Sequence, residues 1–161
     1  MRVRHAHDRE EPMTAGAKGA TTNDRPVRPV VAIVLATSIL IVAVFEAALT
    51  LGTPFGEAAM GGTYTGTLPD EVRLVTGILT LVWFAAAMVV LARGGRSLLP
   101  VPPTVARVGV WVLVGLLGLG ALLNFASSSP WERLCWGPFT LIMFGLCLVL
   151  AVSGSPYRPV K

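Results

Sequence analysis

The sequence is poor in charge. Of its 161 residues only 14% are Asp, Glu, Lys or Arg, whereas 53% are hydrophobic. Soluble proteins carry about 25% charged residues, and a chain this short buries too small a fraction of its surface to hide so many apolar side chains from water. Disorder of the whole chain is excluded for the opposite reason, because disordered chains are poor in apolar residues. An integral membrane protein is the class that remains.

The sequence also lacks the patterns of common catalytic and metal-binding sites. Its two histidines, His5 and His7, lie in the N-terminal tail, and its two cysteines, Cys135 and Cys147, are not spaced as C-x-x-C. An H-x-H pair alone supplies too few ligands and no rigid frame for a metal. No phosphate-binding loop, dinucleotide fingerprint or H-E-x-x-H motif occurs. We therefore expect no cofactor and no metal, and enzymatic activity has little support.

What the sequence does contain is four apolar runs of about 20 residues, each long enough to cross a hydrocarbon core of roughly 30 Å as a helix. In lipid the backbone must satisfy its own hydrogen bonds within the segment, which favours helices. The predicted fold is an all-α membrane protein, a bundle of four transmembrane helices in a domain that spans residues 30–152. The expected helices cover residues 30–52, 70–93, 104–126 and 130–152.

The basic residues divide unevenly between the two ends of these helices. Eleven of the 13 Lys and Arg residues lie in the N-terminal tail, around the connection into the third helix, or in the C-terminal tail; only Arg73 and Arg133 lie at the other end. Lys and Arg are in excess on the cytoplasmic side of membrane proteins. We therefore expect a multi-pass protein with both termini cytoplasmic (N-in/C-in), and the net charge of +4 requires no nucleic-acid partner.

Three segments lie outside the expected helices. Residues 1–29 lack periodicity, which predicts a disordered basic tail, and Met13 is an alternative to Met1 as the initiator. Residues 153–161 form a second short cytoplasmic tail. The outer loop 53–71 is long and rich in Gly and Thr; we expect a flexible connection, although loops of this length are often functional.

The start of the fourth helix carries a capping signal. Ser129 and Glu132 are three residues apart around a proline, the spacing of a capping box in which the hydroxyl and the carboxylate satisfy free backbone N–H groups. Pro138 lies inside this helix and predicts a kink there.

Small residues lie on one face of the first and the third expected helices. Small side chains let helices approach closely in lipid, so these faces are expected to pack within the bundle. The predicted packing residues are Ala32, Ala36, Ala43 and Ala47 in the first helix and Gly115, Gly118 and Ala121 in the third.

Glu46 is the charged residue that the topology leaves unexplained. It lies six residues before Gly52, roughly 9 Å below the outer end of the first helix, where a carboxylate costs a few kcal/mol unless it is paired or protonated. We expect a partner among Arg73, Asn124 and Arg133, which all project near the outer leaflet. The site is then a structural polar clasp or a place that handles a proton or a cation; a Glu that reaches the interface unpaired is the third alternative.

The block Asn124–Pro138, with the sequence NFASSSPWERLCWGP, resembles one found in small four-helix integral membrane proteins of high-GC bacteria, a family without an assigned activity. The likeness covers the end of the third helix, the fourth helix and the Glu in the first. An excess of Arg over Lys, with abundant Ala, Val, Gly and Leu, is typical of a high-GC bacterial gene. The resemblance implies a bacterial plasma (inner) membrane and no particular reaction.

The chain is also similar to the small multidrug resistance transporters, which have four helices and a membrane-embedded Glu in the first. That likeness implies exchange of protons for cations through Glu46. The sequence departs from the family in its greater length, its wide first loop, the shallow position of Glu46 and the lack of the family's aromatic-glycine signature in the third helix.

The leading hypothesis is a non-enzymatic structural or accessory protein that acts by helix packing or partner binding. Its partners are the lipid bilayer and either a second copy or another membrane protein. The alternative is a small proton-coupled transporter or channel that uses Glu46. A third alternative, an enzyme at the outer leaflet, predicts a shared pocket around Glu46, Asn124 and Arg133.

Overall fold

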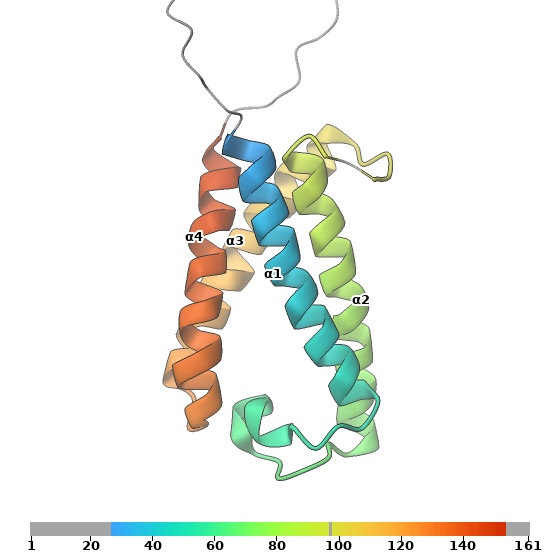
Figure 1. Cartoon of the computed structure of the whole chain (residues 1–161), viewed down its shortest axis with the longest axis vertical. Coiled ribbons are helices and arrows are strands. Elements are labelled where there is room, and N and C mark those ends of the chain that lie inside the picture. Colours follow the sequence, from blue (N-terminus) through green and yellow to red (C-terminus); the bar gives the residue numbers. More distant parts are fainter. Residues whose placement is uncertain (1–26, 97, 154–161) are drawn as a thin grey trace, which may run out of the picture.

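The computed structural model describes residues 27–96 and 98–153, and four long helices run side by side in it (Figure 1). They are α1 (Val27–Thr50), α2 (Asp70–Arg93), α3 (Pro103–Ala126) and α4 (Gly137–Val152). A π-helical turn, η3 (Glu132–Trp136), leads into α4, and the 3-10 turns η1 (Gly56–Ala58) and η2 (Met60–Gly62) lie between α1 and α2.

Each of the four helical segments, with η3 counted as part of the fourth, is long and apolar enough to cross a membrane. The described residues form no strand. The prediction of an all-α bundle with four membrane-spanning candidates is therefore confirmed. Most of both expected tails lies outside the described residues. The same holds for His5 and His7 and for the two candidate initiators, Met1 and Met13.

The irregularity expected at Pro138 takes the form of the π turn η3. The N–H of Gly137 donates to the carbonyl of Glu132, five residues earlier instead of four. A proline inside a helix clashes with the carbonyl four residues before it and cannot donate to it. A single π turn shifts the hydrogen-bond pattern locally, and here it ends just before Pro138, which then occupies the first turn of α4.

The helices pack as two antiparallel pairs, α1 with α2 and α3 with α4. We call the end where α1 stops at Thr50 the loop end, and the end that holds the start of α1 the terminal end. The main core lies between the pairs and includes fully buried Leu35, Ile39, Val90 and Val110. A second, smaller core at the loop end combines Leu49 of α1 with two residues of the following loop, Ala59 and Leu68.

The terminal end is tied together by Arg93, the last residue of α2. Its side chain is buried, and its guanidinium donates to the carbonyls of Ala151 and Ser153 at the end of α4. The last carbonyls of a helix lack partners within the helix and carry partial negative charge, so a cation is favourable there. The hydrogen bonds of Arg93 therefore join the end of α2, in one helix pair, to the end of α4, in the other.

The predicted packing face of α1 lies mostly inside the bundle: Ala32, Ala36 and Ala43 are buried, and Ala47 is half-buried. Contact at the terminal end is so close that a Cβ added to Gly94, the residue that follows α2, would overlap the Cβ of Ala32. Small residues therefore set the separation of α1 and α2.

The expected face of α3 is partly wrong. Ala121 is buried and Gly118 lies against the ring of Phe144, but Gly115 is exposed, and a Cβ added there would meet nothing within 4 Å. The buried side of α3 includes Leu113 and Leu117. Gly115 is two residues from each, which is about 200° around the helix, so it points away from the bundle.

Candidate functional site

The first turns of the fourth helix are hydrogen-bonded to the loop between α1 and α2. The hydroxyl of Ser129 accepts from the N–H of Glu132 at 3.4 Å, which is one half of the predicted capping box. The other half is not formed, because the N–H of Ser129 donates to the hydroxyl of Ser127. The carboxylate of Glu132, which is buried, accepts instead from the N–H of Gly61 in the loop at 2.8 Å.

Two further hydrogen bonds attach the loop at the same place. The hydroxyl of Ser129 donates to the carbonyl of Glu57 at 2.6 Å, and the indole N–H of Trp136 donates to the carbonyl of Ala58 at 3.0 Å. The loop crosses from the end of α1 beneath the bundle toward the start of the fourth helix before it returns to α2 (Figure 1). It therefore has a defined attachment, where the sequence predicts a plain flexible connection.

A groove of about 530 Å³ lies between α1, the attached loop and η3; we call it the aromatic groove. It is lined by Phe45, Pro54, Phe55, Glu57, Ala58, Trp131, Cys135 and Trp136. The rings of Phe45 and Trp136 are 4.7 Å apart between centroids and tilted by 52°. Glu57 is the one charged residue in this lining.

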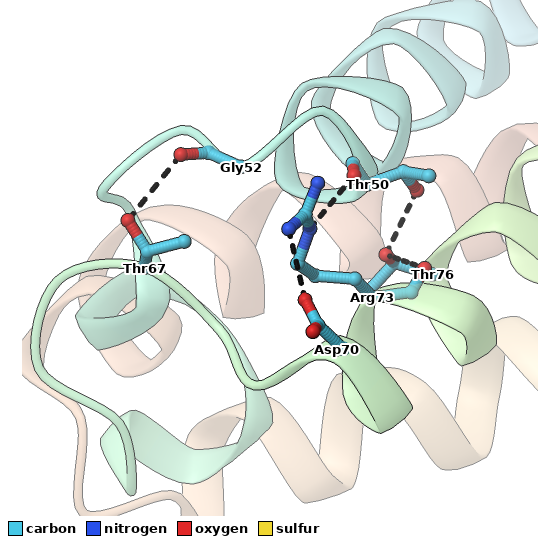
Figure 2. A network of polar contacts seen from close by, with 6 residues as sticks. All are labelled: Thr50, Gly52, Thr67, Asp70, Arg73 and Thr76. Atoms are coloured by element: carbon cyan, nitrogen blue, oxygen red, sulfur yellow. Dashed lines mark hydrogen bonds and ion pairs between the residues drawn. The ribbon is translucent and has the colours of Figure 1, made fainter.

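The ends of α1 and α2 are joined by a separate polar network at the loop end (Figure 2). The Nε of Arg73 donates to the carbonyl of Thr50 at 2.9 Å, and its Nη1 donates to Asp70 at 3.1 Å. The hydroxyls of Thr50 and Thr76 are 2.8 Å apart and share a hydrogen bond. Arg73 thus places positive charge on the C-terminal end of α1, where the helix dipole favours it.

This arrangement does not form the clasp predicted for Glu46. Arg73 bonds to the end of α1 and to Asp70, the amide of Asn124 donates to the hydroxyl of Thr140 at 3.1 Å, and Arg133 is exposed. The Oε2 atom of Glu46 is buried and has no hydrogen-bond partner among the described residues. The pocket expected around Glu46, Asn124 and Arg133 is likewise not assembled by hydrogen bonds between them.

Glu46 instead continues the buried stripe of α1. It lies seven residues after Ile39, which is about 20° around the helix, and Ile39 and Leu35 are fully buried. Its carboxyl group therefore points toward the interior of the bundle. An unpaired buried polar atom costs free energy, so this position marks either a strained structural site or one that takes up a proton or a small ligand.

A second unpaired polar atom lies nearby, on α2. The Nε1 of Trp83 is buried and has no hydrogen-bond partner in the part of the chain that the structure describes. Thr50 lies opposite Thr76, so in an antiparallel pair Glu46 lies near the level of residue 80, within one turn of Trp83. At this level the bundle thus holds a hydrogen-bond acceptor on α1, the Oε2 of Glu46, and a donor on α2, the Nε1 of Trp83. Neither has a hydrogen-bond partner among the described residues.

The described residues contain no group of three or more His, Cys, Asp and Glu side chains that could hold a metal ion. Cys135 is exposed and Cys147 is buried, and neither forms a disulfide.

The aromatic groove, and the place of Glu57 in its lining, were not predicted from the sequence. Trp131, Cys135 and Trp136 are close in sequence and identify one wall. The opposite wall comes from Phe45 and from the loop, which lie between 73 and 91 positions earlier in the chain. No local pattern in the chain indicates that these segments meet.

No family model matches the chain, and no curated protein or solved structure is similar to it.

Proposed function

We propose that this chain is an integral protein of a bacterial plasma membrane, with both termini cytoplasmic, that acts as a structural or accessory protein. In this proposal it binds another membrane protein, or a second copy of itself, through the loop end. The carrying observation is the attachment of the loop to the fourth helix by Ser129, Glu132 and Trp136. A surface that is ordered before binding loses less conformational entropy when a partner binds.

Cross-linking within native membranes tests the partner proposal. A photo-reactive amino acid at exposed Thr65 in the loop should give a discrete protein adduct, whereas one at exposed Leu81 in α2 should react mainly with lipid. Glu132→Ala should weaken the adduct from position 65 at unchanged expression, because it releases the loop. If position 65 gives no discrete adduct, or the same one as position 81, the proposal fails.

The orientation has its own test. The described basic residues Arg28, Arg93, Arg96 and Arg107 lie at the terminal end, and this excess supports placing that end in the cytoplasm. Reporter fusions at Lys161 and near Gly62 should report opposite sides of the membrane. A periplasmic signal from the fusion at Lys161 would overturn the proposed orientation.

The second candidate function is proton-coupled transport or conduction through Glu46. It is favoured by the unpaired Oε2 of Glu46 in the bundle interior, because ionisable groups inside membrane segments often serve ion or proton pathways. In proteoliposomes with a pH gradient, Glu46→Gln should then abolish proton-linked flux at normal expression and stability. If Glu46→Gln changes only expression and thermal stability, the carboxylate is structural.

A further inference from the structure

The aromatic groove has the composition of a site for an organic cation. Its lining includes four aromatic residues, Phe45, Phe55, Trp131 and Trp136, and the acidic residue Glu57, and it includes no Lys or Arg. Ring faces attract cations through their quadrupole, and cages of aromatic residues bind ammonium groups. The volume of about 530 Å³ is that of a small-ligand site.

The rear wall of the groove is fixed before any ligand binds. Trp136 donates its indole N–H to the carbonyl of Ala58, and its ring contacts the rings of Phe45 and Phe139 at centroid distances of 4.7 and 5.9 Å. Its donor is therefore occupied, and the ring is the part of Trp136 that remains to contact a ligand. A pre-ordered wall of this kind lowers the entropic cost of binding.

The mouth of the groove is open and apolar. Trp131 and Phe55 are exposed by 58% and 52%, more than most large aromatic side chains. Exposed apolar side chains also occur farther along both helices: Ile41, one turn from Phe45 on α1, is 52% exposed, and Ile142, on the fourth helix, is 63% exposed. A ligand that fits both the groove and these apolar helix surfaces has a cationic head and a hydrocarbon tail.

The groove lies where a lipid headgroup would lie. Phe45 is five residues from the end of α1, and Trp131 is in the first turn of the fourth helix, so both are near the ends of membrane-spanning candidates. Tryptophan is enriched at this level of a bilayer. We propose that the aromatic groove binds the ammonium headgroup of an aminophospholipid, with the headgroup between the aromatic rings and Glu57 and the acyl chains along α1 and α4. This inference needs no protein partner and is independent of the proposed accessory function.

Cys135 provides a direct readout, because it is exposed and lines the groove, whereas Cys147 is buried. The full chain in detergent is treated with a maleimide, and alkylation is followed for each cysteine by peptide mass spectrometry, with Cys147 as the internal reference. Short-chain phosphatidylethanolamine should slow alkylation of Cys135 by fivefold or more, while phosphatidylglycerol of the same chain length should not.

Two variants show whether the lining residues carry the effect. Glu57→Gln and Trp131→Ala should each remove most of the protection given by phosphatidylethanolamine. Glu71→Gln, which neutralises an exposed carboxylate outside the groove, should leave the protection unchanged. Unaltered alkylation in the absence of lipid shows that each variant keeps its fold.

Three outcomes would overturn the proposal. The first is equal protection by phosphatidylethanolamine and phosphatidylglycerol, which would indicate a non-specific apolar surface. The second is full protection in both Glu57→Gln and Trp131→Ala. The third is equal protection by free ethanolamine at the same concentration, which would replace the lipid by a soluble amine.

Discussion

Replacing Glu132 by Ala tests how the loop is held on the fourth helix. The side chain of Glu132 is 8% exposed, and its Oε1 accepts the N–H of Gly61 at 2.8 Å. A hydrogen bond to a charged group contributes about 1.5–3 kcal/mol net. Gly61 is exposed, so water partly replaces the lost acceptor. We therefore expect the lower part of that range, about 1.5–2 kcal/mol of local stability.

Amide hydrogen exchange measures this loss at the loop itself. Because every 1.4 kcal/mol is a factor of ten, Glu132→Ala should raise the exchange rate of the Gly61 amide by about 10- to 30-fold when reclosing is faster than exchange. Glu132→Gln keeps an acceptor without the charge, and neutral hydrogen bonds still contribute about 1 kcal/mol. That variant should raise the rate by only about 2- to 5-fold.

Glu57→Gln is the matched control. Glu57 lies in the same loop and its side chain is exposed, and the bond that it makes to Ser129 uses its backbone carbonyl. Its neutralisation should leave the exchange rate of the Gly61 amide unchanged. In every variant, the amides in the middle of α2 should exchange at their wild-type rates. Equal exchange at Gly61 in the wild type and in Glu132→Ala would refute the docking argument.

Three further predictions concern the helix contacts. Arg73→Gln should lower the stability in detergent by about 0.5–1.5 kcal/mol, because it removes a half-exposed cation from the end of α1. Arg133→Gln, at an exposed position, should change the stability by less than about 0.5 kcal/mol. Equal effects of the two substitutions on thermal unfolding would contradict the role given to Arg73. Gly94→Ala should cost about 1–3 kcal/mol through overpacking against Ala32, and a neutral result would show that α1 and α2 are not in close contact. Gly115→Ala should be neutral or stabilise α3 by up to about 1 kcal/mol in the monomer; a loss of stability that depends on protein concentration would instead reveal a partner on that face.

The two halves of the bundle are held in different ways. The half at the terminal end has a continuous apolar core and the contact of Arg93 with the last carbonyls of α4. The half at the loop end has, besides residues that pack against that core, the small core around Leu49 and the hydrogen bonds from the loop and from Arg73. Both Glu46 and the aromatic groove lie in this second half, so the features proposed for function lie at the end of the bundle where the loop is attached.

Several features could be predicted because they depend on short stretches of sequence. Four apolar runs of the right length predict four helices, since a backbone in lipid must satisfy its own hydrogen bonds. Ser129 at the start of the fourth helix and the proline at 138 predict local events, and one capping bond and a π turn occur there. The prediction of the other capping bond was wrong, because the carboxylate of Glu132 accepts a hydrogen bond from Gly61 in a loop that is distant in sequence.

The amino-acid sequence by itself determined the all-α class, the four membrane-spanning candidates and most of their bounds. Only the tertiary structure decided which faces of the helices are buried, and with that the burial of the Oε2 atom of Glu46, the outward position of Gly115 and the existence of the aromatic groove. The physical reason is that lipid is as apolar as a protein core, so hydrophobic periodicity does not separate the faces of a membrane helix as it does in water. Rotation and tilt of the helices are set by close packing and by polar contacts between distant segments, and these contacts form only when the whole chain is folded.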